Sequence, residues 1–409
     1  MDRRTFLAAL MATGLPFPAN AQQCRDSASN AHDIGWLTTT MAARYAYLPD
    51  RHIDIEKLRR NYVAEAGAVC EPHAFLNVLE RFLAEFHDHH IEAKVNNAHS
   101  PQLVPSGTDL WATLRDGKAI VELVRPHSEA AKAGVKAGDE IVTIGGGATR
   151  AAVAAHAPRC LSAPDPEADN YTLRVLLAGT HDGRRIFVAR DVAGNERSVD
   201  LPSFVRPDFD TPLTQKTIGA IGCIRIENSL GDSALVEAFD RALADLKDAK
   251  ALILDLRNTP SGGNTDVAEP IMGRFIAQQS GYQRVFDPGR GRTFPKDSWV
   301  RKVPPRGKTI AQPLAVLVNR WTGSMGEGMA IGLDGMKRAT VIGTRMAGLC
   351  GATSDFTLPR SGIGVAFPTE RLYHLDGTPR ETWAPPVFVD PATPGDDPIL
   401  ARAVAILQG

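Results

Sequence analysis

The strongest constraint on the fold lies in the second half of the chain, where short apolar runs alternate with helical patterns. The runs IGAIGCIRI, ALILDLR and PLAVLVN are typical of buried strands, and DSALVEAFDRALADLKDA between the first two is typical of an amphipathic helix. Strands and helices in alternation form crossover units of a parallel sheet. Residues 205–409 are therefore predicted to form an α/β domain whose sites lie where strands end and helices begin.

Two strand-to-helix junctions in this domain carry residues suited to chemistry. The first contains Gly262 and Gly263, whose backbone amides can turn toward a ligand. The second reads WTGSMGEG at 321–328 and places Ser324 at a helix start, beside free backbone N–H groups that can stabilise an oxyanion. Serine followed three residues later by Glu327 is also a capping box. From these residues alone, Ser324 is either a nucleophile or a helix cap.

The start of the chain has the pattern of an export signal. Residues 1–21 combine a charged beginning, a short apolar stretch and an A-N-A cleavage site, and RRTFL at 3–7 resembles a twin-arginine signal. The apolar stretch is too short to span a bilayer. We therefore expect a mature protein from about Gln22 that is periplasmic or secreted, without stable membrane insertion.

Residues 22–100 are predicted to form a helical unit. PHAFLNVLERFLAEF at 72–86 places its large apolar residues on one helix face. The unit ends in HDHH at 87–90, and one interpretation of these histidines is that they bind zinc. Adjacent residues rarely all reach one ion, and a dipole-stabilised group of surface histidines at a helix end is the simpler interpretation. The prediction is no metal and no cofactor.

The cysteine spacing and the charge balance argue against a metal-binding, a thioredoxin-like or a nucleic-acid-binding protein. The chain has five cysteines and no C-x-x-C spacing, which argues against a zinc cluster or a thioredoxin-like motif. In an oxidising compartment we expect one disulfide, and Cys24 with Cys70 is the predicted pair because both flank the N-terminal helices. With 46 Lys and Arg against 47 Asp and Glu, no strong field exists to attract nucleic acid.

Residues 101–204 change to short β-like runs and resemble a PDZ domain. SEAAKAGVKAGDEI at 128–141 carries the resemblance, with Gly134 and Gly138 at turn positions that need positive φ. The resemblance implies that an extended peptide binds as an added strand. At the carboxylate-binding loop, however, the chain reads TDLW at 108–111 where a glycine-rich turn is usual. Recognition of a free C-terminus is therefore left open.

The second half as a whole resembles the serine peptidase family of C-terminal processing (tail-specific) proteases, tricorn core proteases and retinoid-binding-protein-like repeats. The blocks that carry it are LILDLRNTPSGG, PLAVLVNRWTGSMGEGMAIGL, RATVIGTRMAG and YHLDGTPRETWAPPVFVDP. The resemblance implies a crotonase/ClpP-like domain with an inserted PDZ-like domain, and Ser324 as its nucleophile. The tail-specific branch activates its serine with a lysine, but the matching loop, GTRMAGLCGA, has none. Arg345 in that loop keeps its proton at working pH.

The tricorn branch is similar to a Ser-His-Glu arrangement, which picks out His90 and Glu381 in this sequence. Imidazole titrates near neutral pH, so His90 would be the general base and Glu381 would hold its tautomer. The N–H groups of Met325 and of Gly262 or Gly263 would form the oxyanion hole. The family's usual threonine after the histidine is replaced by isoleucine here.

The predicted function is an exported serine endopeptidase that cleaves polypeptides, in unfolded or C-terminal segments, with help from the PDZ-like domain. Two alternatives remain. One is a catalytically inactive family member that binds a peptide or an apolar ligand. The absence of a lysine from the loop GTRMAGLCGA supports this alternative. The other is a zinc-dependent hydrolase that uses the histidine run.

Overall fold

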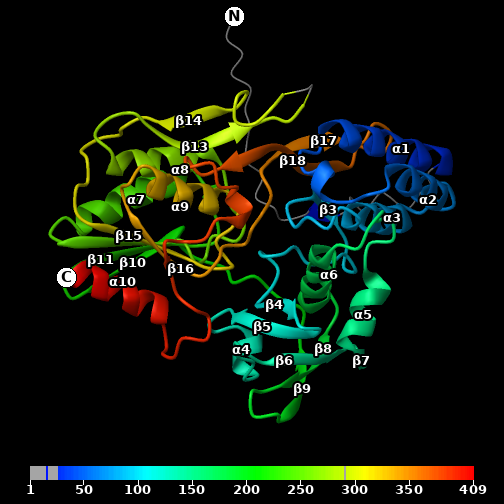
Figure 1. Cartoon of the computed structure of the whole chain (residues 1–409), viewed down its shortest axis with the longest axis horizontal. Coiled ribbons are helices and arrows are strands. Elements are labelled where there is room, and N and C mark those ends of the chain that lie inside the picture. The colour runs from blue at the N-terminus through cyan, green and yellow to red at the C-terminus, as the bar shows by residue number, and fades with distance from the viewer. Residues whose placement is uncertain (1–14, 17–25, 290–291) are drawn as a thin grey trace, which may run out of the picture.

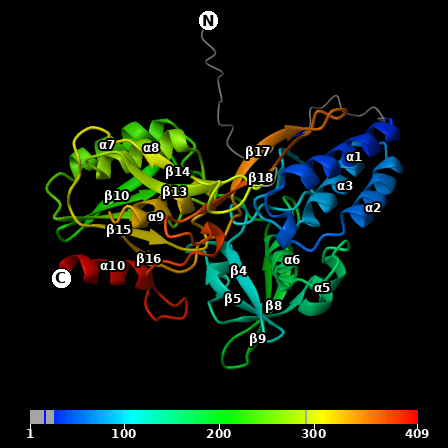
Figure 2. The ribbon, with the colours of Figure 1, turned by 45° about the horizontal axis from the view of Figure 1, so that its top comes forward.

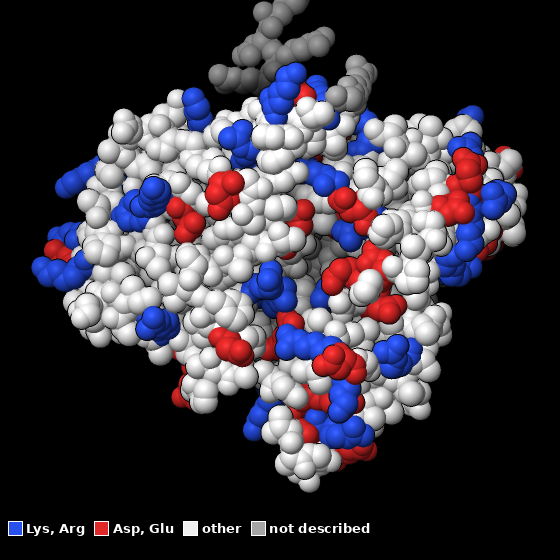
Figure 3. Space-filling model, viewed as in Figure 1, with Lys and Arg blue, Asp and Glu red and all other residues white. Residues whose placement is uncertain are grey.

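The computed structural model describes residues 15–16, 26–289 and 292–409, and these form three parts that lie side by side (Figure 1). The predicted export signal, residues 1–21, lies almost wholly outside the described residues. Where the structure describes the chain, no helix is both long and apolar enough to cross a membrane. Acidic and basic side chains are interspersed on the face shown in Figure 3, which is hollowed where the three parts meet.

The largest part is built on a six-stranded sheet in the order β10-β11-β12-β15-β16-β19. All pairings are parallel except that of β10 with β11. The strands are β10 (Leu213–Ile218), β11 (Ile221–Ile226), β12 (Ala251–Asp255), β15 (Leu314–Val318), β16 (Thr340–Gly343) and β19 (Val387–Phe388). The mixed α/β class predicted for residues 205–409 is confirmed.

Helices cover both faces of this sheet, which explains the continuous apolar runs of its central strands. Along β12, Leu252 and Leu254 face one apolar core, while Ile253 faces the other. The first core is closed by α7 (Ala234–Asp245), α8 (Thr265–Met272) and α9 (Met325–Gly335), and the second by α10 (Pro398–Gln408). Figure 1 shows α10 on the opposite side of the sheet from α7 and α9.

A second sheet joins the α/β part to the N-terminal helices. Its order is β14-β13-β18-β17, and β2 also pairs with β18. In Figure 2, β17 and β18 extend from the α/β part to α1. The elements are β2 (Glu92–Ala93), β13 (Ser280–Phe286), β14 (Trp299–Val303), β17 (Ala352–Thr357) and β18 (Gly364–Tyr373). Because β2 immediately follows the histidine run, this pairing fixes the end of the helical unit against the C-terminal half of the chain.

The helical unit consists of α1 (Ser27–Arg44), α2 (Ile55–Gly67) and α3 (Pro72–Ala84). The predicted apolar face of α3 is buried, and the core around it also contains Val365 and Phe367 of β18. A unit of only three helices has little interior of its own, so the hairpin of β17 and β18 completes its core. Cys70 is disulfide-bonded, and its predicted partner Cys24 lies outside the described residues.

The third part is an antiparallel sheet in the order β4-β5-β6-β8-β9. Gly134 and Gly138 have φ of +79° and +90°, as the turn pattern predicts. The strands are β4 (Leu110–Arg115), β5 (Lys118–Val124), β6 (Glu140–Ile144), β7 (Gly147–Ala148), β8 (Arg185–Arg190) and β9 (Glu196–Leu201), and the helices are α4 (Glu129–Lys132), α5 (Thr149–His156) and α6 (Pro166–Ala178). A two-stranded pair, β1 (Leu15–Pro16) with β3 (Val95–Asn96), completes the described strands.

Candidate active site

Ser324 sits in a strained turn between β15 and α9. Its φ and ψ are 48° and −110°, a region that residues other than glycine rarely adopt. Backbone strain of this kind costs about 1–3 kcal/mol and concentrates at functional sites. A sharp strand-to-helix turn is also how nucleophilic serines are presented in α/β-hydrolases.

Glu327 holds this turn in place. Its buried carboxylate accepts the N–H of Ser324 at 2.8 Å, and it also accepts the N–H groups of Gly348 at 2.8 Å and Leu349 at 3.2 Å. Burial raises the pKa of Glu327 to about 7, because its effect outweighs the opposing effects of Arg380 and the three N–H donors. The capping position predicted for Glu327 is confirmed, and the same carboxylate fixes the loop that follows β16.

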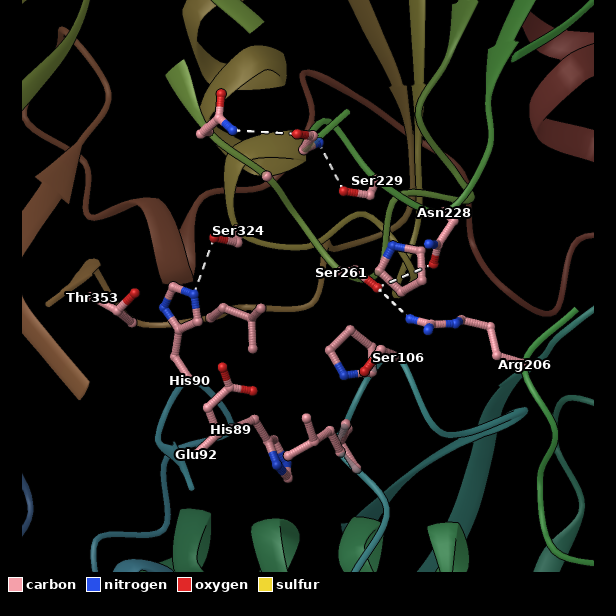
Figure 4. A pocket seen from close by; sticks show the side chains of 18 of the residues that line it. His89, His90, Glu92, Ser106, Arg206, Asn228, Ser229, Ser261, Ser324 and Thr353 are labelled. Atoms are coloured by element: carbon pink, nitrogen blue, oxygen red, sulfur yellow. Dashed lines mark hydrogen bonds between the residues drawn. The ribbon is translucent and has the colours of Figure 1, made fainter. Parts of the chain in front are cut away.

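The hydroxyl of Ser324 faces the imidazole of His90 (Figure 4). Ser324 Oγ lies 3.0 Å from His90 Nε2, and His90 Nδ1 lies 2.5 Å from the carbonyl oxygen of Cys350. A carbonyl only accepts, so Nδ1 carries the proton and Nε2 offers its lone pair to the serine hydroxyl. Burial lowers the pKa of His90, and Arg380 lowers it further. The imidazole is therefore neutral near pH 7 and able to take a proton.

Glu381 is not hydrogen-bonded to His90, which differs from the predicted Ser-His-Glu contact. The position beside Nδ1 is occupied by the Cys350 carbonyl, because Arg380 holds that loop through the carbonyls of Leu349 at 2.9 Å and Gly351 at 2.7 Å. Burial raises the pKa of Glu381. Its Oε2 is buried and has no hydrogen-bond partner within the part of the chain that the structure describes.

The predicted oxyanion donors fall into two groups. The N–H of Gly262 donates to the Thr259 carbonyl at 3.1 Å, so it is not free, and this part of the prediction is wrong. The N–H groups of Met325 and Gly263 have no acceptor among the residues described. Gly262 matters for another reason, since a Cβ there would lie only 2.4 Å from Ser324 Cβ.

The other two histidines of the run point to different partners. His87 Nε2 lies 2.9 Å from Asp165 Oδ2, and the His89 ring stacks on Tyr171 with centroids 4.5 Å apart. Burial lowers the pKa of both imidazoles. Over the described ranges, no group of three or more His, Cys, Asp or Glu is arranged to hold a metal ion.

A pocket of about 220 Å³ opens beside Ser324, and all three parts of the molecule line it (Figure 4). His89, His90, Glu92 and Lys94 come from the end of the helical unit. Segment 103–106 and Arg206 flank the β-rich part. The α/β part contributes Asn228, Ser229, Gly231, Pro260, Ser261, Gly263, Asn264, Ser324, Leu349 and Thr353.

Side chains of α6 bind the free edge of β4, where a PDZ-like domain would add a peptide strand. Asn170 Oδ1 of α6 accepts the N–H of Leu114 at 2.8 Å, and Arg174 Nε donates to the carbonyl of Ala112 at 3.2 Å. Asp109, in the segment that departs from the PDZ pattern, forms a buried ion pair with Arg185. In this structure, a peptide would have to displace these side chains to pair with β4.

Comparisons with known proteins agree with this architecture. Residues 220–385 match the family model described as peptidase family S41. The photosystem II D1 C-terminal processing protease is 21% identical, with 91% of this chain and 97% of that chain covered and a TM-score of 0.59. Mature CPAF is 14% identical, with 93% and 96% covered and a TM-score of 0.60. A putative peptidase from Parabacteroides merdae is 16% identical, with 93% and 97% covered and a TM-score of 0.52. None of the curated proteins matches the chain.

The structural likenesses, all at low identity, show a shared fold, and the family match identifies the α/β part. That part defines the chain as a serine-type peptidase. Over residues 220–385 the chain is similar to peptidase family S41, and its fold is similar to that of the D1 C-terminal processing protease.

Proposed function

We propose that the chain is an exported endopeptidase in which Ser324 is the nucleophile and His90 is its general base. The observation that carries the proposal is the 3.0 Å contact between Ser324 Oγ and His90 Nε2, in the tautomer that the Cys350 carbonyl enforces. Serine is a weak nucleophile until a base takes its proton, and a neutral imidazole at this distance meets that need.

The proposed reaction is acyl transfer to water. Ser324 Oγ attacks the peptide carbonyl carbon while His90 Nε2 takes the hydroxyl proton, and the N–H groups of Met325 and Gly263 stabilise the oxyanion. His90 then gives that proton to the leaving amine, and water hydrolyses the ester by the same route in reverse. The Cys350 carbonyl, which keeps its bond to Nδ1–H, stabilises the imidazolium.

Glu381 has a secondary role in this proposal. It makes no hydrogen bond to His90, so its carboxylate acts on the imidazolium only after a side-chain movement or through space. We therefore expect its removal to cost much less activity than the removal of His90.

The substrate is a polypeptide that lies in the pocket between the three parts. In this proposal, residues 101–204 form a PDZ-like domain that assists substrate binding. Its contribution comes from the segments where the chain enters and leaves it, since segment 103–106 and Arg206 line the pocket. Export to the periplasm or the medium rests on residues 1–21 and is consistent with the disulfide at Cys70.

The proposal is tested by incubating the mature chain, from Gln22, with reduced and alkylated casein. We expect cleavage by the wild type and none by Ser324→Ala or His90→Ala. Folding of both variants is checked by circular dichroism. Cleavage that survives in a folded Ser324→Ala protein would reject Ser324 as the nucleophile. A folded wild type that binds casein without cleaving it would favour the inactive peptide-binding alternative.

A further inference from the structure

The pocket beside Ser324 contains one cation without an acidic partner. Of its charged lining residues, Lys94 and Glu92 neutralise each other, with Nζ and Oε1 at 2.5 Å. Arg206 has no carboxylate within ion-pair distance among the residues that the structure describes. Its Nη1 donates a hydrogen bond to Ser261 Oγ at 3.3 Å. Most of its five N–H donors therefore remain for a ligand.

Arg206 is positioned rather than loosely exposed. Ser261 Oγ accepts from Arg206 and also lies 3.1 Å from Asn228 Oδ1, which fixes the acceptor (Figure 4). Two residues upstream, the carbonyl of Phe204 accepts the Gln102 side chain at 2.9 Å, and the guanidinium of Arg125 stacks 5.6 Å from the Phe204 ring centroid. The segment that carries Arg206 is thus held two residues upstream, at Phe204, and through the Arg206 side chain itself.

The surroundings of Arg206 add to its positive potential. Burial, together with the charges of Arg225 and Arg206, lowers the pKa of Arg125 to about 10, although Asp109 and Glu227 oppose this shift. The carboxylate of Glu227, which lies near this group, already pairs with Arg225 and accepts a hydrogen bond from Asn258. A site with excess positive charge and free guanidinium donors favours a carboxylate, for which arginine has a matching geometry.

We propose that Arg206 forms a carboxylate subsite of the proposed peptidase, so that substrates with an acidic group a few residues from the scissile bond are preferred. The spacing follows from Ser261, which adjoins the Gly262 that packs against Ser324. Two sources supply such a group, an Asp or Glu side chain and the C-terminal carboxylate of the polypeptide. A C-terminal carboxylate fits only on the leaving-group side. The proposal rests on the proposed function of the same pocket.

The test measures binding, so that it does not depend on catalysis. Ser324→Ala protein is titrated with a dye-labelled alanine hexapeptide in three forms, as the free acid, as the C-terminal amide, and as the amide with aspartate at each position in turn. We expect at least one acidic form to bind about 10-fold more tightly than the neutral amide, the usual size of a charge-assisted hydrogen bond. Tighter binding of the free acid identifies a C-terminal carboxylate, and tighter binding of an aspartate form identifies a side chain.

Variants at Arg206 separate a subsite from a structural role. In the Ser324→Ala background, Arg206→Ala should abolish the preference, Arg206→Lys should retain part of it, and Arg206→Glu should reverse it toward lysine-containing peptides. Arg184→Ala is the matched control, because this exposed arginine pairs with Asp200 and does not line the pocket. Equal binding of acidic and neutral peptides, or a preference that survives Arg206→Ala, would overturn the proposal.

Wild-type cleavage of casein, measured in parallel, keeps the two proposals distinguishable. Cleavage without an acidic preference rejects the subsite alone. An Arg206-dependent acidic preference in binding, together with no cleavage by the folded wild type, rejects the catalytic proposal alone.

Discussion

Gly262→Ala tests how closely the loop after β12 packs against Ser324. Gly262 has φ of +64°, and a Cβ there would lie 2.4 Å from Ser324 Cβ, 3.0 Å from Ser324 Oγ and 3.3 Å from the Met325 nitrogen. The substitution therefore combines a backbone penalty with a steric overlap. Gly145→Ala is the matched control, since Gly145 has φ of +60° and no atom within 4 Å of its added Cβ.

The two terms can be separated by magnitude. A left-handed backbone costs an alanine about 1–2 kcal/mol, which is the expected loss for Gly145→Ala. Overpacking a rigid site adds about 1–3 kcal/mol, so Gly262→Ala should lose about 2–5 kcal/mol in urea unfolding followed by tryptophan fluorescence. Displacement of the Ser324 hydroxyl by about 1 Å should also lower casein cleavage by about 10²-fold, with Gly145→Ala unaffected.

A double variant makes the prediction refutable. Ser324→Gly removes the Cβ that Gly262→Ala would strike, so in this background the cost of Gly262→Ala should fall toward that of Gly145→Ala. If Gly262→Ala lowers the free energy of unfolding equally with and without the Ser324 side chain, close packing against Ser324 is not the reason for a glycine at position 262.

Four further predictions concern the residues around Ser324. Glu381→Gln should lower kcat/KM for a casein-derived peptide by less than about 10-fold. His90→Ala should lower it by at least about 10²-fold, which is the usual contribution of a general base. Equal losses in the two variants would support a direct contact between Glu381 and His90. Because burial lowers the pKa of His90, activity should persist below pH 6.5 and fall only as the pH drops through the lowered value; a pH–rate profile with its midpoint above 6.5 would contradict this. The neutral His89, whose Nε2 is buried, should make the fold less stable as the pH falls below about 6.5, since only the unfolded chain then gains its proton. His89→Phe should weaken that pH dependence in urea titrations at pH 5 and 7. Glu327→Gln should destabilise the fold by about 1–3 kcal/mol, because an amide nitrogen cannot accept the N–H groups that the carboxylate holds; an unchanged urea midpoint would contradict this.

The sequence predicted those features of the fold that depend on the type of side chain, such as apolar strands and glycine-rich turns. The apolar runs of β12 and β15 predicted buried strands of an α/β sheet, and the glycines around Ser324 predicted the junction itself. The meeting of Ser324 with His90, 234 residues apart, followed only from resemblance, because nothing in the local pattern of either segment encodes their contact.

The parts that were missed depend on the backbone. The partner of His90 Nδ1 is the carbonyl of Cys350, and a carbonyl has no signature in a sequence. In the same way, the N–H of Gly262 is consumed by a turn whose closure depends on tertiary packing. The shared core of the helical unit and β18 also escaped prediction, because residues 22–100 give no sign of a hairpin that comes more than 250 residues later.

The most direct test of the central claim is fluorophosphonate labelling of the mature wild-type protein, with the modified residue located by peptide mass spectrometry. An activated serine reacts, whereas a serine that only caps a helix does not. The account predicts one adduct, on Ser324, that disappears in Ser324→Ala and in a folded His90→Ala protein. Labelling of a different serine, or undiminished labelling of Ser324 without His90, would contradict it.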